Sequence, residues 1–109
     1  MITNIKSEEN DMRLKELTSD IIIRKEDITK DGSRYIYTMT AKDNNIVPGL
    51  GIMLYSIRIE MTDEFGITTS AEIRDIFSNL AKAEAFFEKL VRNLATPINL
   101  IYILEDEIS

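Results

Sequence analysis

The chain has no cysteine, no histidine and no tryptophan, and the first two absences exclude much of enzyme chemistry. Without cysteine there are no disulfides, no thiolate metal ligands and no cysteine nucleophile. Without histidine, the commonest general base and the commonest zinc ligand are missing, and no imidazole-based catalytic triad can form. We therefore expect neither enzymatic activity nor a cofactor.

Basic residues are also in the minority. Thirteen lysines and arginines face nineteen aspartates and glutamates, which gives a formal net charge of −6. A surface of this sign repels phosphate backbones, so nucleic acid is not an expected partner. No apolar run approaches the roughly 18 residues of a membrane span, and the acidic N-terminus has no apolar signal core. The sequence predicts no membrane attachment and a cytoplasmic location.

The length of 109 residues suits one domain and is too short for two. Residues 1–17 are polar and rich in charge, and we interpret them as an N-terminal arm. Residues 18–109 then form a single α+β domain. Within it, residues 42–51 contain Asn-Asn, Pro48 and two glycines, which predicts a long loop. This loop either serves as a lid or recognition loop, or packs onto the edge of the domain.

Four segments have the composition or alternation of strands: 19–28, 34–41, 53–62 and 67–76. Asp31-Gly32 predicts a tight hairpin between the first two, because both turn positions need positive φ. A three-residue loop ending in Gly66 connects the last two and fixes their register. In that register Ile57 faces Ile73, and Arg58 faces Glu72 as an ion pair.

The C-terminal third predicts a helix followed by a strand. The apolar spacing indicates a helix over 79–94, with Ser78 or Asn79 as its N-cap. Pro97 ends it, and the apolar run 98–104 reads as a strand. The predicted fold is β-β-β-β-α-β, a mostly antiparallel five-stranded sheet with one helix on one face. The fifth strand pairs either with the first, giving the order 4-3-2-1-5, or parallel with the fourth.

The alternation of the strands and the helical spacing together define an expected core. In the helix, Leu80 belongs to the buried stripe and Phe86 lies at its edge, partly exposed. The residues expected to be mostly buried are Tyr55, Ile57, Ile59, Ala71, Ile73, Ala83, Phe87, Leu90, Val91, Leu94, Leu100 and Tyr102.

Three segments carry a family resemblance: YSIRIEM at 55–61, IRDIFSN at 73–79, and the run from Phe86 to Asp106. Together they resemble a family of small proteins from clostridia and related Gram-positive anaerobes, defined as a domain of unknown function. In that family an acidic residue precedes the helix, here Asp75, and a Thr-Pro pair follows it. The resemblance covers about residues 35–106. It implies no activity, cofactor or catalytic residue.

One group of carboxylates is a candidate metal site. Because a single helix connects them, the fourth and fifth strands are expected to run in the same direction, so Asp75 ends at the same end of the sheet as Glu105 and Asp106. Oxygen ligands gathered there could bind Mg²⁺ or Ca²⁺. Alternatively, Asp75 stabilises the N-terminus of the following helix, and residues 105–107 form a solvated tail.

The tyrosines are a second candidate site. Tyr35, Tyr37, Tyr55 and Tyr102 either line a small-ligand pocket or pack in the core and on the sheet. Since the composition argues against catalysis, we expect the protein to be a non-enzymatic protein-interaction or regulatory module with an unknown protein partner. The alternative is a domain that binds a small ligand or a divalent metal through the tyrosines or the acidic end.

The last segment also suggests self-association. Ile101 and Ile103 form an apolar face that a single helix on the opposite side of the sheet leaves uncovered. A symmetric homodimer would bury this face. Alternatively, the N-terminal arm covers it through Met12, Leu14 and Leu17.

Overall fold

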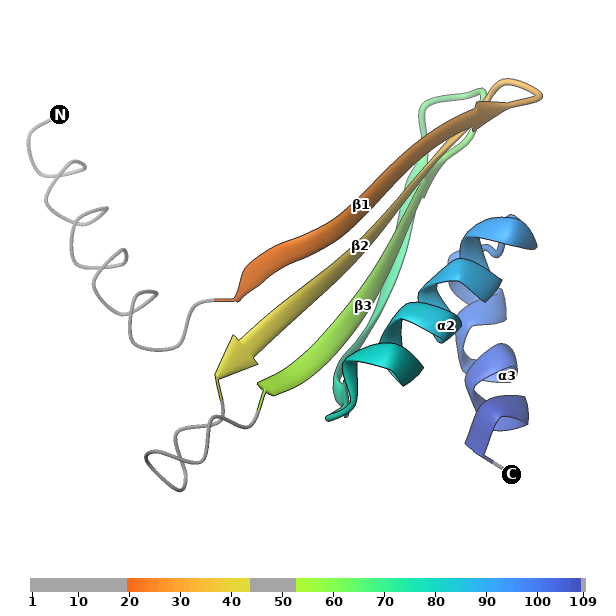
Figure 1. The fold of residues 1–109 in the computed structure, drawn as a ribbon. Helices are drawn as coiled ribbons and strands as arrows, with labels where there is room; N and C mark the ends of the chain where they lie inside the picture. Colours follow the sequence, from red (N-terminus) through yellow and green to blue (C-terminus); the bar gives the residue numbers. More distant parts are fainter. Residues whose placement is uncertain (1–19, 44–52, 109) are drawn as a thin grey trace, which may run out of the picture.

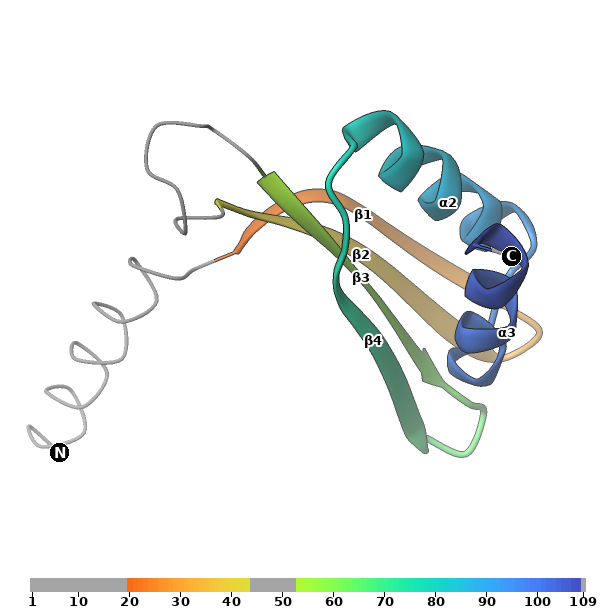
Figure 2. The ribbon, with the colours of Figure 1, turned by 90° about the horizontal axis from the view of Figure 1, so that it is seen from below.

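The computed structural model describes residues 20–43 and 53–108 (Figure 1). The described elements, in chain order, are the strands β1 (Ile21–Lys30), β2 (Ser33–Asp43), β3 (Met53–Thr62) and β4 (Thr68–Phe77), then the helices α2 (Leu80–Arg92) and α3 (Pro97–Ile108). The strands form an antiparallel sheet in the order β1-β2-β3-β4. Both helices cover the same face of it, which gives two layers (Figure 2). The predicted arm at 1–17 and most of the predicted loop at 42–51 lie outside the described residues.

The hairpins follow from their turn residues. Asp31 and Gly32 both have positive φ, 54° and 83°, and they connect β1 to β2 as the Asp-Gly pair predicts. Gly66 has φ 84° in the β3–β4 loop. In that loop the Asp63 carboxylate accepts hydrogen bonds from the backbone amides of Phe65 and Ile67. These contacts close the loop with the register that the sequence predicts.

The β3–β4 register is confirmed, although one predicted ion pair is wrong. Ile57 lies opposite Ile73, and Arg58 opposite Glu72. However, Arg58 pairs with Glu60 on its own strand at 3.6 Å, and Glu72 pairs with Arg74 at 3.3 Å. Neighbours two positions along a strand share a face, so they compete with the cross-strand partner.

The predicted five-stranded sheet with one helix is wrong. The segment predicted as the fifth strand, 98–104, lies within the helix α3, so the sheet has four strands and two helices pack on it. Thr96 begins this helix as a capping residue: its hydroxyl accepts the amide N–H of Asn99, and the Asn99 side chain accepts the amide N–H of Thr96. Pro97 takes the first helical position, where a missing N–H costs nothing. Thr-Pro thus starts a helix here.

The helix α2 begins at one of its two predicted N-caps. Asn79 is the N-cap, and its side chain accepts the amide N–H of Lys82. At the other end Leu94 adopts φ 50° and Ala95 donates to the carbonyl of Leu90, which is a Schellman ending. The N–H of Leu94 donates to the carbonyl of Val91 in the same motif.

The core lies between the sheet and both helices. Tyr37, Met39, Ile57 and Ile59 of the sheet are fully buried there. So are five residues of the helices: Ala83, Phe86, Phe87 and Leu90 of α2 and Leu100 of α3. The predictions for Leu80 and Tyr102 are wrong because both are exposed. Phe86, predicted to be partly exposed, is fully buried and packs against Phe77 at 5.4 Å between ring centroids.

An ion pair and a ring contact fasten the edge strand β1 to α2. The Arg24 guanidinium donates to the Glu88 carboxylate at 2.7 Å and lies 4.9 Å from the centre of the Phe87 ring. The hydrogen bond to Glu88 is the main reason why the pKa of Arg24 is raised. Within the described residues, no helix is both long and apolar enough to cross a membrane.

Candidate functional site

The most irregular point of the sheet is a bulge in β4 around Asp75. Tyr55 pairs with Phe77 and Ile57 with Ile73, so three residues of β4 lie opposite Ser56 alone. Asp75 sits in this bulge with φ 54°, a left-handed conformation that aspartate tolerates better than most residues. Its amide donates to the hydroxyl of the buried Ser56 at 2.8 Å. The bulge thereby turns the Asp75 carboxylate toward Lys42 at 3.1 Å.

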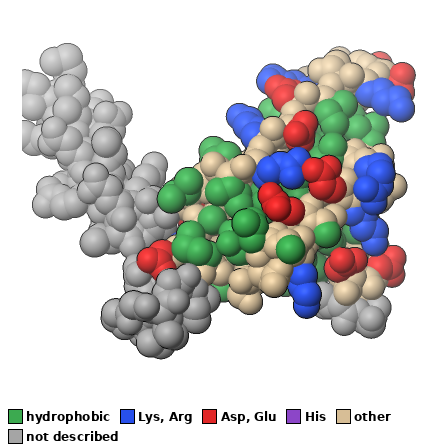
Figure 3. Space-filling view, in the orientation of Figure 1, with side chains coloured by type: hydrophobic (Ala, Val, Ile, Leu, Met, Phe, Trp, Pro, Cys, Tyr) green, Lys and Arg blue, Asp and Glu red, His purple; other side chains and the backbone are tan. Residues whose placement is uncertain are grey.

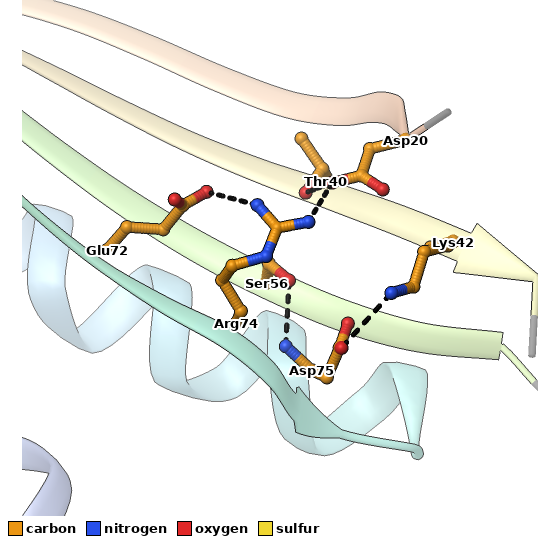
Figure 4. A network of polar contacts seen from close by, with 7 residues as sticks. All are labelled: Asp20, Thr40, Lys42, Ser56, Glu72, Arg74 and Asp75. Carbon is orange, nitrogen blue, oxygen red and sulfur yellow. Dashed lines mark hydrogen bonds and ion pairs between the residues drawn. The ribbon is translucent and has the colours of Figure 1, made fainter. Parts of the chain in front are cut away.

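A polar cluster surrounds this bulge on the sheet face that the helices leave open (Figure 4). The Arg74 guanidinium bridges Glu72 at 3.3 Å and Asp20 at 3.4 Å. Thr40 donates to the same Asp20 oxygen that accepts from Arg74. Each cation in the cluster already has a carboxylate partner, so the cluster holds the bulge and the start of β1 in place.

The structure does not assemble the predicted metal site. Asp75 faces Lys42 on the open side of the sheet, whereas Glu105 and Asp106 belong to α3 on the helical side. Across residues 20–43 and 53–108 no three acidic side chains come together in a group that could hold a metal ion. The prediction that these carboxylates lie together depended on 98–104 being a strand parallel to β4, and this segment is part of the helix α3.

A cleft of about 470 Å³ lies where β4 passes into α2, next to the end of α3. Residues 76–79 line it together with Lys82 and Glu107, which carry opposite charges. Glu107 also pairs with Lys89 at 3.5 Å, which links the two helices. No sequence pattern indicates this cleft, because it forms only when α3 lies beside α2.

The four tyrosines do not share a pocket. Tyr37 is fully buried, and its hydroxyl donates to the Ala95 carbonyl at 2.8 Å, which ties β2 to the α2–α3 connection. Burial raises the pKa of Tyr37 to about 12. Tyr35 stacks against Tyr37 with ring centroids 6.4 Å apart, and Tyr55 is buried. Tyr102 lies apart from them on the exposed side of α3.

The outer face of α3 is the clearest exposed apolar feature of a helix in this structure. We use this name for Ile98, Ile101 and Tyr102, which are 77%, 52% and 65% exposed and follow the i, i+3, i+4 spacing of one helical face. Ile103, which the sequence placed beside Ile101, instead packs partly buried against the core. The spacing of Ile98 and Tyr102 could have revealed this face had the segment been recognised as a helix.

A second exposed apolar group lies at the start of β1. Figure 3 shows hydrophobic side chains gathered there, and Ile21, Ile22 and Ile23 are all exposed. β1 is an edge strand, which can in principle pair with another chain. However, the register between β1 and β2 shifts between Ile22 and Arg24, and such a bulge interrupts the regular row of donors and acceptors. This group is therefore a poorer template for pairing than a straight edge.

The fold and its surfaces define a small α+β domain in which a four-stranded antiparallel meander carries two C-terminal helices on one face. The chain belongs to a family of unknown function, DUF6514, whose characteristic pattern matches residues 19–109. The match confirms the resemblance to a domain of unknown function. No curated protein shows significant similarity to the chain, and no solved structure does so either.

Proposed function

We propose that this domain is a non-enzymatic protein-interaction module that contacts its partner through the outer face of α3. The observation that carries the proposal is the exposure of three large apolar side chains, Ile98, Ile101 and Tyr102, along one side of a helix. The other side of the same helix supplies the buried Leu100 to the core, so the fold holds this face in position. Exposed apolar surface on a well-packed element commonly marks a contact with another macromolecule.

The chemistry of the chain supports a binding role over catalysis. The sequence contains no histidine or cysteine. The two cations around the bulge at Asp75, Lys42 and Arg74, are each paired with a carboxylate, and the most buried tyrosine, Tyr37, donates to a backbone carbonyl. We expect the protein to act in the cytoplasm of a clostridial or related Gram-positive anaerobe, without nucleic acid, membrane or cofactor.

Photo-crosslinking tests this proposal. A photoreactive phenylalanine derivative in place of Tyr102 should give discrete protein adducts in native extract, because it replaces an aromatic side chain of the outer face. The same derivative in place of Phe65, which is also highly exposed but lies in the β3–β4 loop, is the matched control. The adducts at position 102 should disappear when Ile98 and Ile101 are both changed to Gln. The same adducts at both positions, or none at position 102, would contradict the proposal.

Small-ligand binding at the cleft between β4, α2 and α3 is the second candidate function. The observation favouring it is the cleft itself, which is lined in part by the charged residues Lys82 and Glu107. A thermal-shift screen against charged metabolites tests it. A saturable stabilisation that is lost in Lys82→Gln and kept in Lys25→Gln would favour this function over the interaction module.

A further inference from the structure

The charged residues of the helix α3 are distributed unevenly between its two ends. Its first turn contains no acidic residue and its last turn contains no basic residue, while Glu105, Asp106 and Glu107 gather near its C-terminal end. The helix dipole places positive partial charge at the N-terminal end and negative partial charge at the C-terminal end. The three acids therefore sit at the end that disfavours them. Glu107 already pairs with Lys89 at 3.5 Å. For the exposed Glu105, a neighbouring helix N-terminus would relieve the repulsion.

The acidic end and the outer face of α3 meet at one residue. Glu105 is exposed and follows Ile98 by seven positions, so Ile98, Ile101, Tyr102 and Glu105 occupy the same side of the helix. Along this side an apolar stretch near the positive end leads to a carboxylate near the negative end. Such a side is complementary to a copy of itself that runs in the opposite direction. In a parallel arrangement the two acidic ends would repel each other.

We infer that the partner of the outer face of α3 is a second copy of this chain, held in an antiparallel α3–α3 pair with twofold symmetry. This inference rests on the proposed interaction function and names its partner. The symmetry axis passes between Ile101 and Tyr102, so Ile101 of one copy contacts Tyr102 of the other. Glu105 of each copy then lies beside Ile98 of the other, against the positive end of that helix.

The size of this face sets the strength of the pair. α3 is 12 residues, or about 18 Å, long, and three apolar side chains per copy bury less than the roughly 800 Å² per partner of a standard interface. The dimer should therefore be weak, with a dissociation constant of order micromolar or above. Its formation should be seen by sedimentation velocity of the full chain over a broad concentration range.

A neutral substitution tests which surface mediates association. The double variant Ile101→Gln/Tyr102→Gln removes apolar contact without adding charge, and both side chains are exposed, so the fold should be kept. It should raise the dissociation constant at least tenfold. The matched control Ile21→Gln/Ile22→Gln changes the other exposed apolar group and should leave association unchanged. Loss of association in the control alone would overturn the inference in favour of edge pairing through β1.

Disulfide trapping tests whether the two α3 helices run antiparallel. Because the chain has no native cysteine, only the introduced cysteines can form disulfides. The variant Ile98→Cys/Glu105→Cys should form intermolecular disulfides under mild oxidation. Ile98→Cys alone should not, because its two copies would be about 10 Å apart along the axis, beyond the reach of a disulfide. Rapid crosslinking of the single variant would show a parallel pair and overturn the inference.

The two proposals fail in different ways. If the full chain stays monomeric at all concentrations while position 102 still forms adducts in extract, the second-copy partner is wrong and the interaction function stands. If the chain is monomeric and position 102 forms no adducts, both are wrong. If the chain dimerises and adducts at position 102 are only to itself, both are supported.

Discussion

Replacing Tyr37 by Phe removes a single buried hydrogen bond that joins the sheet to the helical layer. The Tyr37 hydroxyl donates to the carbonyl of Ala95 at 2.8 Å, and Ala95 is almost fully buried. In the variant that carbonyl loses its side-chain partner where water cannot easily replace it. Leaving a buried acceptor unsatisfied costs about 1–3 kcal/mol. The expected loss in the free energy of unfolding is therefore about 1–3 kcal/mol.

Urea unfolding monitored by circular dichroism measures this loss. With an m-value of about 1–3 kcal/mol per molar urea for a small domain, the midpoint should fall by about 1 M. Tyr35→Phe is the control, since Tyr35 is only partly buried and its ring stacking survives the change. Its effect should stay under about 0.5 kcal/mol. Equal effects of the two substitutions would refute the reasoning that the Ala95 contact holds the two layers together.

Three further predictions concern the same framework. Burial raises the pKa of Tyr37 to about 12, so the contribution of the neutral phenol to the free energy of unfolding is complete below pH of about 10 and should fall as the pH rises toward 12. Urea midpoints compared across that pH range should decline less steeply in Tyr37→Phe than in the unsubstituted protein, and identical slopes would contradict the prediction. Asp75→Gly should be more stable than Asp75→Ala by about 1 kcal/mol, since both lose the Lys42 ion pair but only alanine is strained at φ 54°; equal melting temperatures would argue against a left-handed bulge. Thr96→Ala should cost about 1 kcal/mol by removing the cap of α3, and an unchanged melting temperature would mean that the helix starts elsewhere.

Local patterns in the sequence were enough to predict the four strands that the sheet contains, but not its strand number, because a fifth strand was also predicted. Alternation over 53–62 located β3 with both of its ends, and the turn residues Asp31-Gly32 and Gly66 fixed two hairpins. The pairing of Ile57 with Ile73 followed from the loop length and the buried face alone. These features are local, because a hairpin needs only a turn and two matching faces.

The C-terminal segment could not be assigned in the same way. The run 98–104 is apolar on every side, so it shows neither a helical nor a strand period. Thr96-Pro97 has two opposite uses: proline ends a preceding helix, and it is also favoured at the first position of a new one. The Asn99 side chain, which completes the cap, decides between them in the structure. A capping threonine followed by proline and, two residues later, asparagine is the local pattern that indicates the start of α3.

The same change from strand to helix rearranges two of the candidate groups, the apolar face and the carboxylates. As a strand, the segment placed Ile101 and Ile103 on one face and gathered Glu105 and Asp106 with Asp75. As a helix, it separates Ile101 from Ile103 and carries the acids to the other side of the sheet from Asp75. The bulge at Asp75 depends on its contact with Ser56, a neighbour in the fold that no local pattern reveals.

A dilution series monitored by ¹⁵N-resolved NMR tests the central claim most directly, that two copies of this chain associate through the outer face of α3. As the full chain is concentrated, the amide resonances of Ile98, Ile101, Tyr102 and Glu105 should shift together along one binding curve, while those of Ile21 and Ile22 stay fixed. Shifts confined to the start of β1, or no shift in α3 at any concentration, would contradict the account.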